Sequence, residues 1–88
     1  MKRIIFSPHA QERLILRGAT EAEARTAMLE GERLPARRGR AAFRKNFPFH
    51  AEWKGRYYEV KQVMPVVVEE NDAMVVVTVY VFYFGGAR

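Results

Sequence analysis

The longest apolar run of the chain extends from Met74 to Phe84 and contains no glycine, proline or charged residue. Its members are nearly all β-branched or aromatic, which is typical of a largely buried β-strand. The two polar members, Thr78 and Tyr80, are two positions apart and therefore point to the same face of such a strand. That face is where we look for function first.

A different pattern begins the chain. Residues 2–6 could form a short strand. Ser7 is a typical helix cap, and Pro8 suits the first helical position, where its missing N–H costs nothing. Gly18 suits the left-handed conformation just beyond a helix end. The sequence therefore predicts a helix from Pro8 to about Arg17.

A second helix is predicted directly after the first. Thr20 and Glu23 have the spacing of a capping box, and Gly31 marks the expected end of the helix. Two short helices with a tight connection form an αα-hairpin. The stretch that follows, 32–40, is basic and contains a proline and a glycine, which indicates an exposed loop.

Beyond Phe43 the hydrophobic period changes to two, which indicates β-strands. Lys54-Gly55 and Asn71-Asp72 are typical two-residue hairpin turns. They connect three successive antiparallel strands, expected over Phe47–Trp53, over Arg56–Val63 and on toward Glu70, and from Ala73 onward. With both helices on one face of a sheet of three or four antiparallel strands, the fold class is α+β, and the bare face can hold an extended ligand.

Counting outward from the turns assigns the two faces, provided that no strand bulges. The pairs include Ala51–Tyr58, Phe49–Val60 and Val66–Val77. The face expected to meet the helices carries Phe47, Phe49, Ala51, Trp53, Tyr58, Val60, Met64, Val66, Val68, Val75, Val77, Val79 and Val81. The open face carries His50, Tyr57, Glu59, Lys61, Val63, Val67, Val76, Thr78, Tyr80 and Phe82. Pro65 often marks a bulge, and a bulge there would move Lys61 and His50 to the face opposite Thr78.

The length, the composition and the net charge of the chain limit the class of protein. Eighty-eight residues form a single domain, 1–88, and no apolar run reaches the roughly 18 residues of a membrane span. The absence of cysteine, and two histidines without clustered carboxylates, predict no metal and no cofactor. The N-terminus turns polar at Ser7, before any signal-peptide core, so a cytoplasmic location is expected. The net charge of +5 favours polyanionic partners, above all RNA.

Basic residues concentrate in one segment. Six of them fall within thirteen residues: Arg33, Arg37, Arg38, Arg40, Arg44 and Lys45. The segment either contacts phosphates or is a solvated loop. The residues expected to contact nucleic acid are Arg17, Arg37, Arg38, Arg40, Lys45, His50 and Tyr57.

Two groups of residues could carry chemistry. His9 lies in the first helical turn, where the helix dipole favours an uncharged imidazole that can accept a proton. Arg13 lies one turn later on the same face and could hold a phosphate near it. The alternative is that His9 only caps its helix and that Arg13 pairs with a nearby glutamate, namely Glu12, Glu21 or Glu23.

Lys61, Thr78 and Tyr80 form the second group, as neighbours on the open face. Lysine could neutralise a scissile phosphate, tyrosine could donate a proton or stack on a base, and threonine could bond a phosphate oxygen. The alternative is that threonine and tyrosine are simply good strand residues. His50 shares this face by the count, but beside Glu59 it could be only half of a polar cross-strand pair.

Three stretches carry a resemblance: Phe6-Ser7-Pro8-His9-Ala10-Gln11-Glu12-Arg13, Arg17-Gly18-Ala19-Thr20-Glu21-Ala22-Glu23 and Val76-Val77-Thr78-Val79-Tyr80. Together they resemble a bacterial domain-of-unknown-function family, the one numbered four-two-five-eight, which is similar to RelE and BrnT toxins and to metal-free ribonucleases of the barnase type. The resemblance implies a RelE-like fold and an RNA-cleaving or RNA-binding role, with His9, Arg13, Thr78 and Tyr80 as the matching positions. Ala19 departs from the larger apolar residue that is usual in that family.

Two functions are therefore expected. The first is a small metal-free endoribonuclease, the toxin of a toxin–antitoxin pair, in which His9 is the base, Arg13 and Lys61 stabilise charge, and Tyr80 assists the leaving group. The alternative is a non-catalytic module that binds nucleic acid or protein through the open face and the arginine-rich segment. A homodimer through the C-terminal strand is a third possibility, because an apolar edge invites strand pairing.

Overall fold

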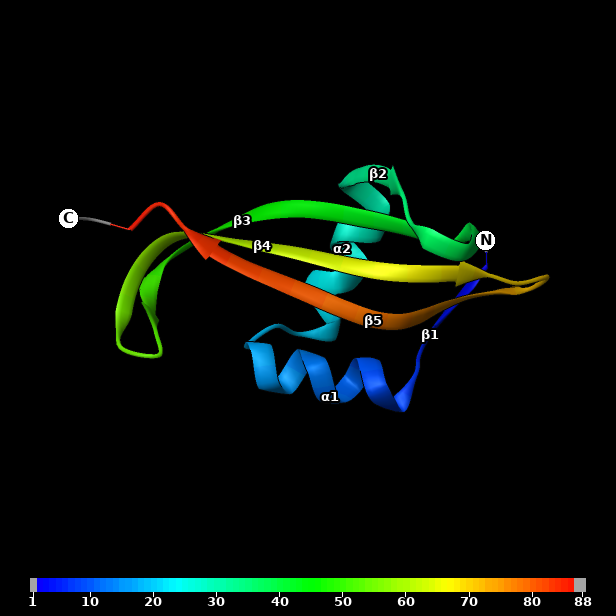
Figure 1. Cartoon of the computed structure of the whole chain (residues 1–88), viewed down its shortest axis with the longest axis horizontal. Coiled ribbons are helices and arrows are strands. Elements are labelled where there is room, and N and C mark those ends of the chain that lie inside the picture. Colours follow the sequence, from blue (N-terminus) through cyan, green and yellow to red (C-terminus); the bar gives the residue numbers. More distant parts are fainter. Residues whose placement is uncertain (1, 87–88) are drawn as a thin grey trace.

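The structure, a computed structural model that describes residues 2–86, has a sheet with both helices on one of its faces (Figure 1). The elements in chain order are β1 (Arg3–Phe6), α1 (Pro8–Arg17), α2 (Glu21–Glu30), β2 (Glu32–Pro35), a 3-10 turn (Arg37–Gly39), β3 (Ala41–Trp53), β4 (Arg56–Glu69) and β5 (Ala73–Phe84). Across residues 2–86, no helix is long and apolar enough to cross a membrane.

The strands are arranged in the order β1-β5-β4-β3-β2. The three long strands β3, β4 and β5 form the predicted antiparallel meander, and the α+β class is confirmed. The strand count is wrong, because short strands extend the sheet at both edges. β1 pairs in parallel with β5, and β2 lies in the stretch 32–40, where the sequence predicts a loop. The sheet is therefore mixed and has five strands.

The predicted helix ends are confirmed. The Ser7 side chain accepts a hydrogen bond from the backbone N–H of Ala10 at 3.0 Å. Gly18 ends α1 in the left-handed conformation, with a φ of 77°. The capping box that starts α2 is complete, because Thr20 and Glu23 each accept a bond from the other's backbone N–H at 3.1 Å. Short-range hydrogen bonding thus fixes where both helices begin.

The two helices do not form the expected paired αα-hairpin. α1 packs along β5, whereas α2 packs on β3 and β4 (Figure 1). The buried residues of α1 are Ala10 and Leu14, and those of α2 are Ala24 and Ala27. The three small alanines among them let each helix approach the sheet closely, so the main apolar contact of each helix is with strands.

A bulge in β5 changes the register that the turn count predicts. Val77 is one extra residue between two adjacent pairs, Val67–Val76 and Val66–Thr78. Between this bulge and the turn at Asn71-Asp72, the residue pairs of β4 and β5 are those predicted by counting from the turn. Beyond the bulge, every residue of β5 is shifted by one position relative to β4, so the predicted pair Val66–Val77 is wrong.

A second bulge lies in β3. The pairing of β3 with β4 shifts between Pro48 and Ala51, where His50 adopts a φ of 48°. Pro48 takes the place opposite Val60 that the count assigns to Phe49. The predicted pairing of His50 with Glu59 is therefore absent as well.

The faces of the sheet differ from those assigned by counting. The buried core comprises Phe6, Ala10, Leu14, Ala19, Ala24, Ala41, Phe43, Val63, Val67, Val76 and Val79. Three of these, Val63, Val67 and Val76, are assigned to the open face by the count, and this assignment is wrong. Conversely, Met64 and Val66 share the helix-free face with Thr78, although the count places them in the core.

The outer edge of β5 is occupied over its first half. β1 pairs with residues 73–76 of β5. Beyond them, the Ser7 hydroxyl donates to the carbonyl of Val77 at 3.3 Å, and an Arg17 Nη donates to that of Val79 at 2.8 Å. A homodimer through this strand would have only the C-terminal half of the edge for pairing.

Candidate nucleic-acid interface

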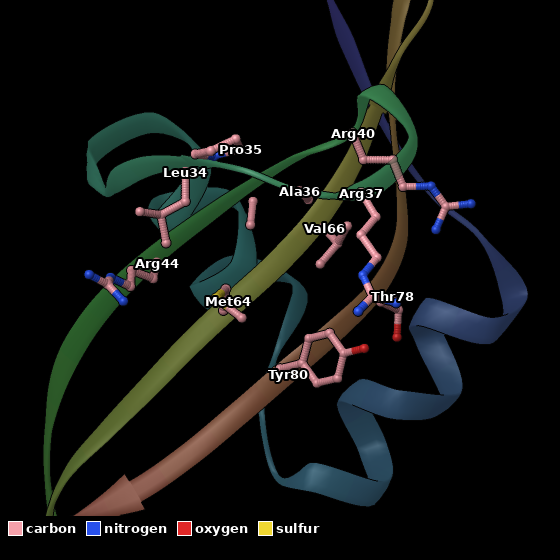
Figure 2. A pocket seen from close by; sticks show the side chains of 11 residues that line it. Leu34, Pro35, Ala36, Arg37, Arg40, Arg44, Met64, Val66, Thr78 and Tyr80 are labelled. Carbon is pink, nitrogen blue, oxygen red and sulfur yellow. The ribbon is translucent and has the colours of Figure 1, made fainter.

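The helix-free face of the sheet contains an open hollow of about 530 Å³ (Figure 2). It is lined by Leu34, Pro35, Ala36, Arg37, Arg40, Ala42, Arg44, Met64, Val66, Thr78 and Tyr80. The floor is apolar, and the polar side chains come from β3, β5 and the 3-10 turn. Such a combination of an apolar floor and a few convergent polar groups is typical of a ligand site.

A tight turn brings two arginines over the hollow. The backbone N–H of Ala36 donates to the Arg40 carbonyl at 3.1 Å, and the Arg40 N–H donates to the Arg37 carbonyl at 3.2 Å. The Arg37 side chain extends across the sheet toward Thr78 (Figure 2). Within residues 2–86, neither Arg37 nor Arg40 forms an ion pair, and Arg44 pairs with Glu32 at 2.9 Å. The hollow therefore has an excess of positive charge that suits an anion.

Arg17 lies at the opposite rim of the hollow, beside β5. Its hydrogen bond to the carbonyl of Val79 holds the guanidinium 5.3 Å from the centroid of the Tyr80 ring. Tyr80 thus has cationic side chains on both sides, from α1 and from the 3-10 turn. An aromatic ring between arginines is a common element of surfaces that bind unpaired nucleotides.

His9 and Arg13 lie on the same stripe of α1 as Arg17, because residues four apart share a helix face. Arg13 Nε donates to His9 Nε2 at 3.4 Å, and His9 is exposed. Within the described chain, no carboxylate pairs with Arg13, so the alternative of a glutamate partner is not what the structure shows. α1 packs along β5, but neither His9 nor Arg13 lines the hollow.

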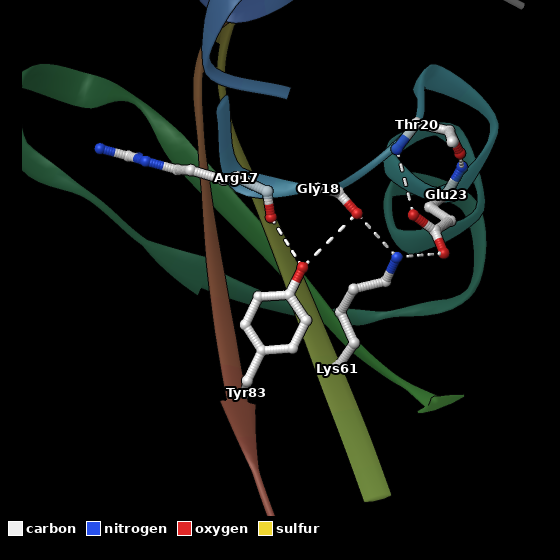
Figure 3. A network of polar contacts seen from close by, with 6 residues as sticks. All are labelled: Arg17, Gly18, Thr20, Glu23, Lys61 and Tyr83. Carbon is white, nitrogen blue, oxygen red and sulfur yellow. Dashed lines mark hydrogen bonds and ion pairs between the residues drawn. The ribbon is translucent and has the colours of Figure 1, made fainter. Parts of the chain in front are cut away.

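Lys61 does not belong to this site, and its predicted position on the open face is wrong. Its side chain is 8% exposed and lies on the helix-covered face. Lys61 Nζ donates to the carbonyl of Gly18 at 3.0 Å and pairs with Glu23 Oε2 at 2.9 Å (Figure 3). The bulge in β5 separates Lys61 from Thr78 and Tyr80, so the three do not form one catalytic group.

Lys61 instead joins a polar network that anchors the connection between the helices (Figure 3). Tyr83 donates its hydroxyl to the carbonyl of Arg17 at 2.7 Å. Burial, and secondarily the charge of Glu23, raises the pKa of Tyr83 to about 12, so this hydroxyl stays a proton donor at neutral pH. The Tyr83 ring is stacked with that of Trp53, at a centroid distance of 5.1 Å. The network fixes the end of α1, from which the Arg17 side chain extends.

Four residues expected to contact nucleic acid lie away from the hollow, namely Arg38, Lys45, His50 and Tyr57. Lys45 pairs with Glu30 at 3.6 Å. His50 Nδ1 lies 3.4 Å from the Tyr57 hydroxyl, near a second hollow lined by Asn46, Phe47, Pro48, His50, Glu59 and Val60. Arg38 is exposed on the 3-10 turn, with a φ of 61°.

The structure adds residues that the sequence does not assign to the site. Arg44 lies in the basic segment, but only the register of β3 places it among the residues that line the hollow rather than on the side of α2. Leu34, Met64 and Val66 give no polar signal, and they form the floor of the hollow only because of the register of β4 and β5. Within residues 2–86, no group of three or more histidine, aspartate or glutamate side chains is placed to hold a metal ion.

No protein-family model matches this chain, and no curated protein or solved structure matches it.

Proposed function

We propose that this protein binds single-stranded RNA on the helix-free face of its sheet. The observation that carries the proposal is the hollow that Arg37, Arg40 and Arg44 line together with Thr78 and Tyr80, with Arg37 extending toward Thr78 (Figure 2). Phosphate is the anion that an arginine cluster on a +5 protein favours most in the cell, because guanidinium groups bond it in a bidentate way. Tyr80 adds a surface for base stacking.

An RNA strand is favoured over a protein ligand by the charges around the site. Of the residues lining the hollow, three are arginines and none is acidic. The hydroxyls of Thr78 and Tyr80 can both donate and accept hydrogen bonds, which allows contact with a phosphate oxygen or a ribose 2′-hydroxyl. Binding to the phosphate backbone should therefore supply most of the affinity and make it depend on salt.

The test is the affinity of a labelled hexanucleotide RNA, measured by fluorescence anisotropy at several salt concentrations. We expect the double variant Arg37→Ala/Arg40→Ala to bind at least tenfold more weakly, and the salt slope to decrease by about 0.7 for each phosphate that is no longer neutralised. The matched control is Arg3→Ala/Arg25→Ala, which removes the same charge from positions where each arginine faces a carboxylate at 3.9 Å. Equal weakening by both double variants would show non-specific charge attraction and refute the proposed site.

A second candidate function is metal-free RNA cleavage at the same face. The exposed His9, which accepts a hydrogen bond from Arg13 on α1, is the observation that favours it. His9 would take the proton of a ribose 2′-hydroxyl while its oxygen attacks the adjacent phosphorus, and Arg13 would stabilise charge on the phosphate. The bond from phosphorus to the 5′-oxygen would break, and the departing 5′-oxygen would take a proton from solvent. Lys61 has no part in this step. The resemblance to RelE-like toxins agrees with this role, in which an antitoxin protein would compete for the face.

For this candidate we expect His9→Ala to lower the rate of RNA cleavage by about a hundredfold or more, with RNA affinity unchanged. His50→Ala serves as the control, since His50 lies by the second hollow. Gel analysis of an RNA and of its 2′-deoxy analogue reports cleavage. An RNA that is bound but stays intact would exclude the nuclease and leave the binding function standing.

A further inference from the structure

A row of exposed aromatic rings continues from the hollow along β5. Tyr80, Phe82 and Phe84 occupy alternate positions of the strand, and their exposed fractions are 42%, 45% and 42%. The pairing of β5 with β4 is regular from Thr78 to Phe84, so the three rings project from the same face. Exposed aromatic side chains in a continuous row are unusual on a surface and indicate a binding partner.

The spacing of these rings identifies the kind of partner. The centroids of Tyr80 and Phe82 are 6.5 Å apart, and the ring planes differ by 16°. Figure 2 shows the Tyr80 ring nearly face-on when the hollow is viewed from the open side. Bases stacked in a helix are only about 3.4 Å apart along the strand. Successive bases on successive rings must therefore be pulled apart, which only an unpaired, extended strand allows.

The neighbours of the row also favour a nucleic acid over an apolar protein surface. Phe82 pairs across the strands with Gln62, whose side-chain amide donates to Asn46 at 2.8 Å. This bond leaves the Gln62 side-chain carbonyl and the Asn46 amino group available for the edge of a base. Beside Tyr80, the Arg17 guanidinium provides a cation for the phosphate backbone.

From these observations we propose that the row formed by Tyr80, Phe82 and Phe84 is a base-stacking track for one unpaired base per ring. The inference rests on the proposed RNA-binding function and specifies its ligand, an extended single strand. The first base stacks on Tyr80, and the phosphates next to it lie in the arginine-lined hollow. The following two bases stack on Phe82 and Phe84. Double-stranded RNA does not fit, because its bases are stacked and paired.

The test compares Phe82→Ala with wild type, using a labelled RNA hexamer and a hexamer of the same backbone without bases. Removal of one stacking ring should weaken binding of the normal hexamer about tenfold or more, with an unchanged salt slope. The base-free hexamer should bind wild type weakly, and Phe82→Ala should not weaken it further. Ile15→Ala is the matched control, because Ile15 is an apolar side chain of α1 that is 79% exposed.

The outcomes separate this inference from the proposed function. If the arginine variants weaken RNA binding but Phe82→Ala weakens neither hexamer, or weakens both equally, the track is refuted and the RNA site stands. If wild type binds no RNA, both proposals fail. If Phe82→Ala changes only the oligomeric state in sedimentation, the row is a protein contact, which also refutes the track. Melting curves by circular dichroism confirm that the variants are folded.

Discussion

Replacing Lys61 with alanine is expected to lower the melting temperature by more than about 10 °C, through a loss of about 3 kcal/mol in the free energy of unfolding. The Lys61 ammonium is buried and bonded to both Glu23 and the carbonyl of Gly18. Removing it leaves a carboxylate that is only 25% exposed without its cation and leaves the Gly18 carbonyl with one donor fewer. Thermal unfolding followed by circular dichroism measures the effect.

The control for this prediction is Lys45→Ala, which removes a lysine from an ion pair whose partner, Glu30, is 64% exposed. That change should cost less than about 1 kcal/mol, because water replaces an exposed ion pair. A further variant, Lys61→Met/Glu23→Gln, removes both charges and should recover part of the stability that Lys61→Ala removes. If Lys61→Ala and Lys45→Ala destabilise equally, the buried network does not anchor the fold as we describe.

Local sequence signals predicted the helices well, because their ends are fixed by residues close together in the chain. Ser7, Gly18 and the Thr20–Glu23 pair each act within a few residues, and each acts as the sequence predicts. The two hairpin turns are correct for the same reason. The relative position of the helices could not be predicted in this way, because it depends on which strands the small alanines contact.

The faces of the sheet could not be predicted by counting, because a bulge has a weak local signature in an all-valine stretch. Val77 is chemically identical to Val75 and Val76 before it, yet it is the extra residue of β5. Pro65 did signal an irregularity, and it lies opposite Val79, two residues from that bulge. The bulge places Thr78 and Tyr80 on the face opposite Lys61, which stays on the core side with Val63 and Val67, where Glu23 and Gly18 stabilise its charge.

The arginines of the candidate site were predicted in part. Their concentration in the sequence indicated a phosphate contact, and Arg37 and Arg40 do line the hollow. The concentration of basic residues in the sequence does not show, however, to which face of the sheet each side chain points. Arg44 and Lys45 are consecutive in β3 and therefore point to opposite faces, so only one of them reaches the hollow.

The last prediction concerns Gly18, where the structure leaves no room for a side chain. A Cβ at this position would lie 2.6 Å from both the Trp53 ring and the Tyr83 hydroxyl, and the φ of 77° is itself unfavourable for alanine. Gly55 has a similar φ of 85° but no atom within 4 Å of such a Cβ. Gly55→Ala should therefore cost only the backbone strain, about 1 kcal/mol.

Gly18→Ala should cost about 3 kcal/mol or more, because the rings must also move apart. Urea unfolding of the two variants separates strain, which both share, from overpacking, which only Gly18→Ala has. Equal destabilisation of the two variants would mean that the side chains of Trp53 and Tyr83 move aside at little cost and do not hold the turn in place. A larger destabilisation at Gly18, accompanied by weaker RNA binding of the folded variant, would connect the turn to function, because the same turn fixes the Arg17 guanidinium over Tyr80.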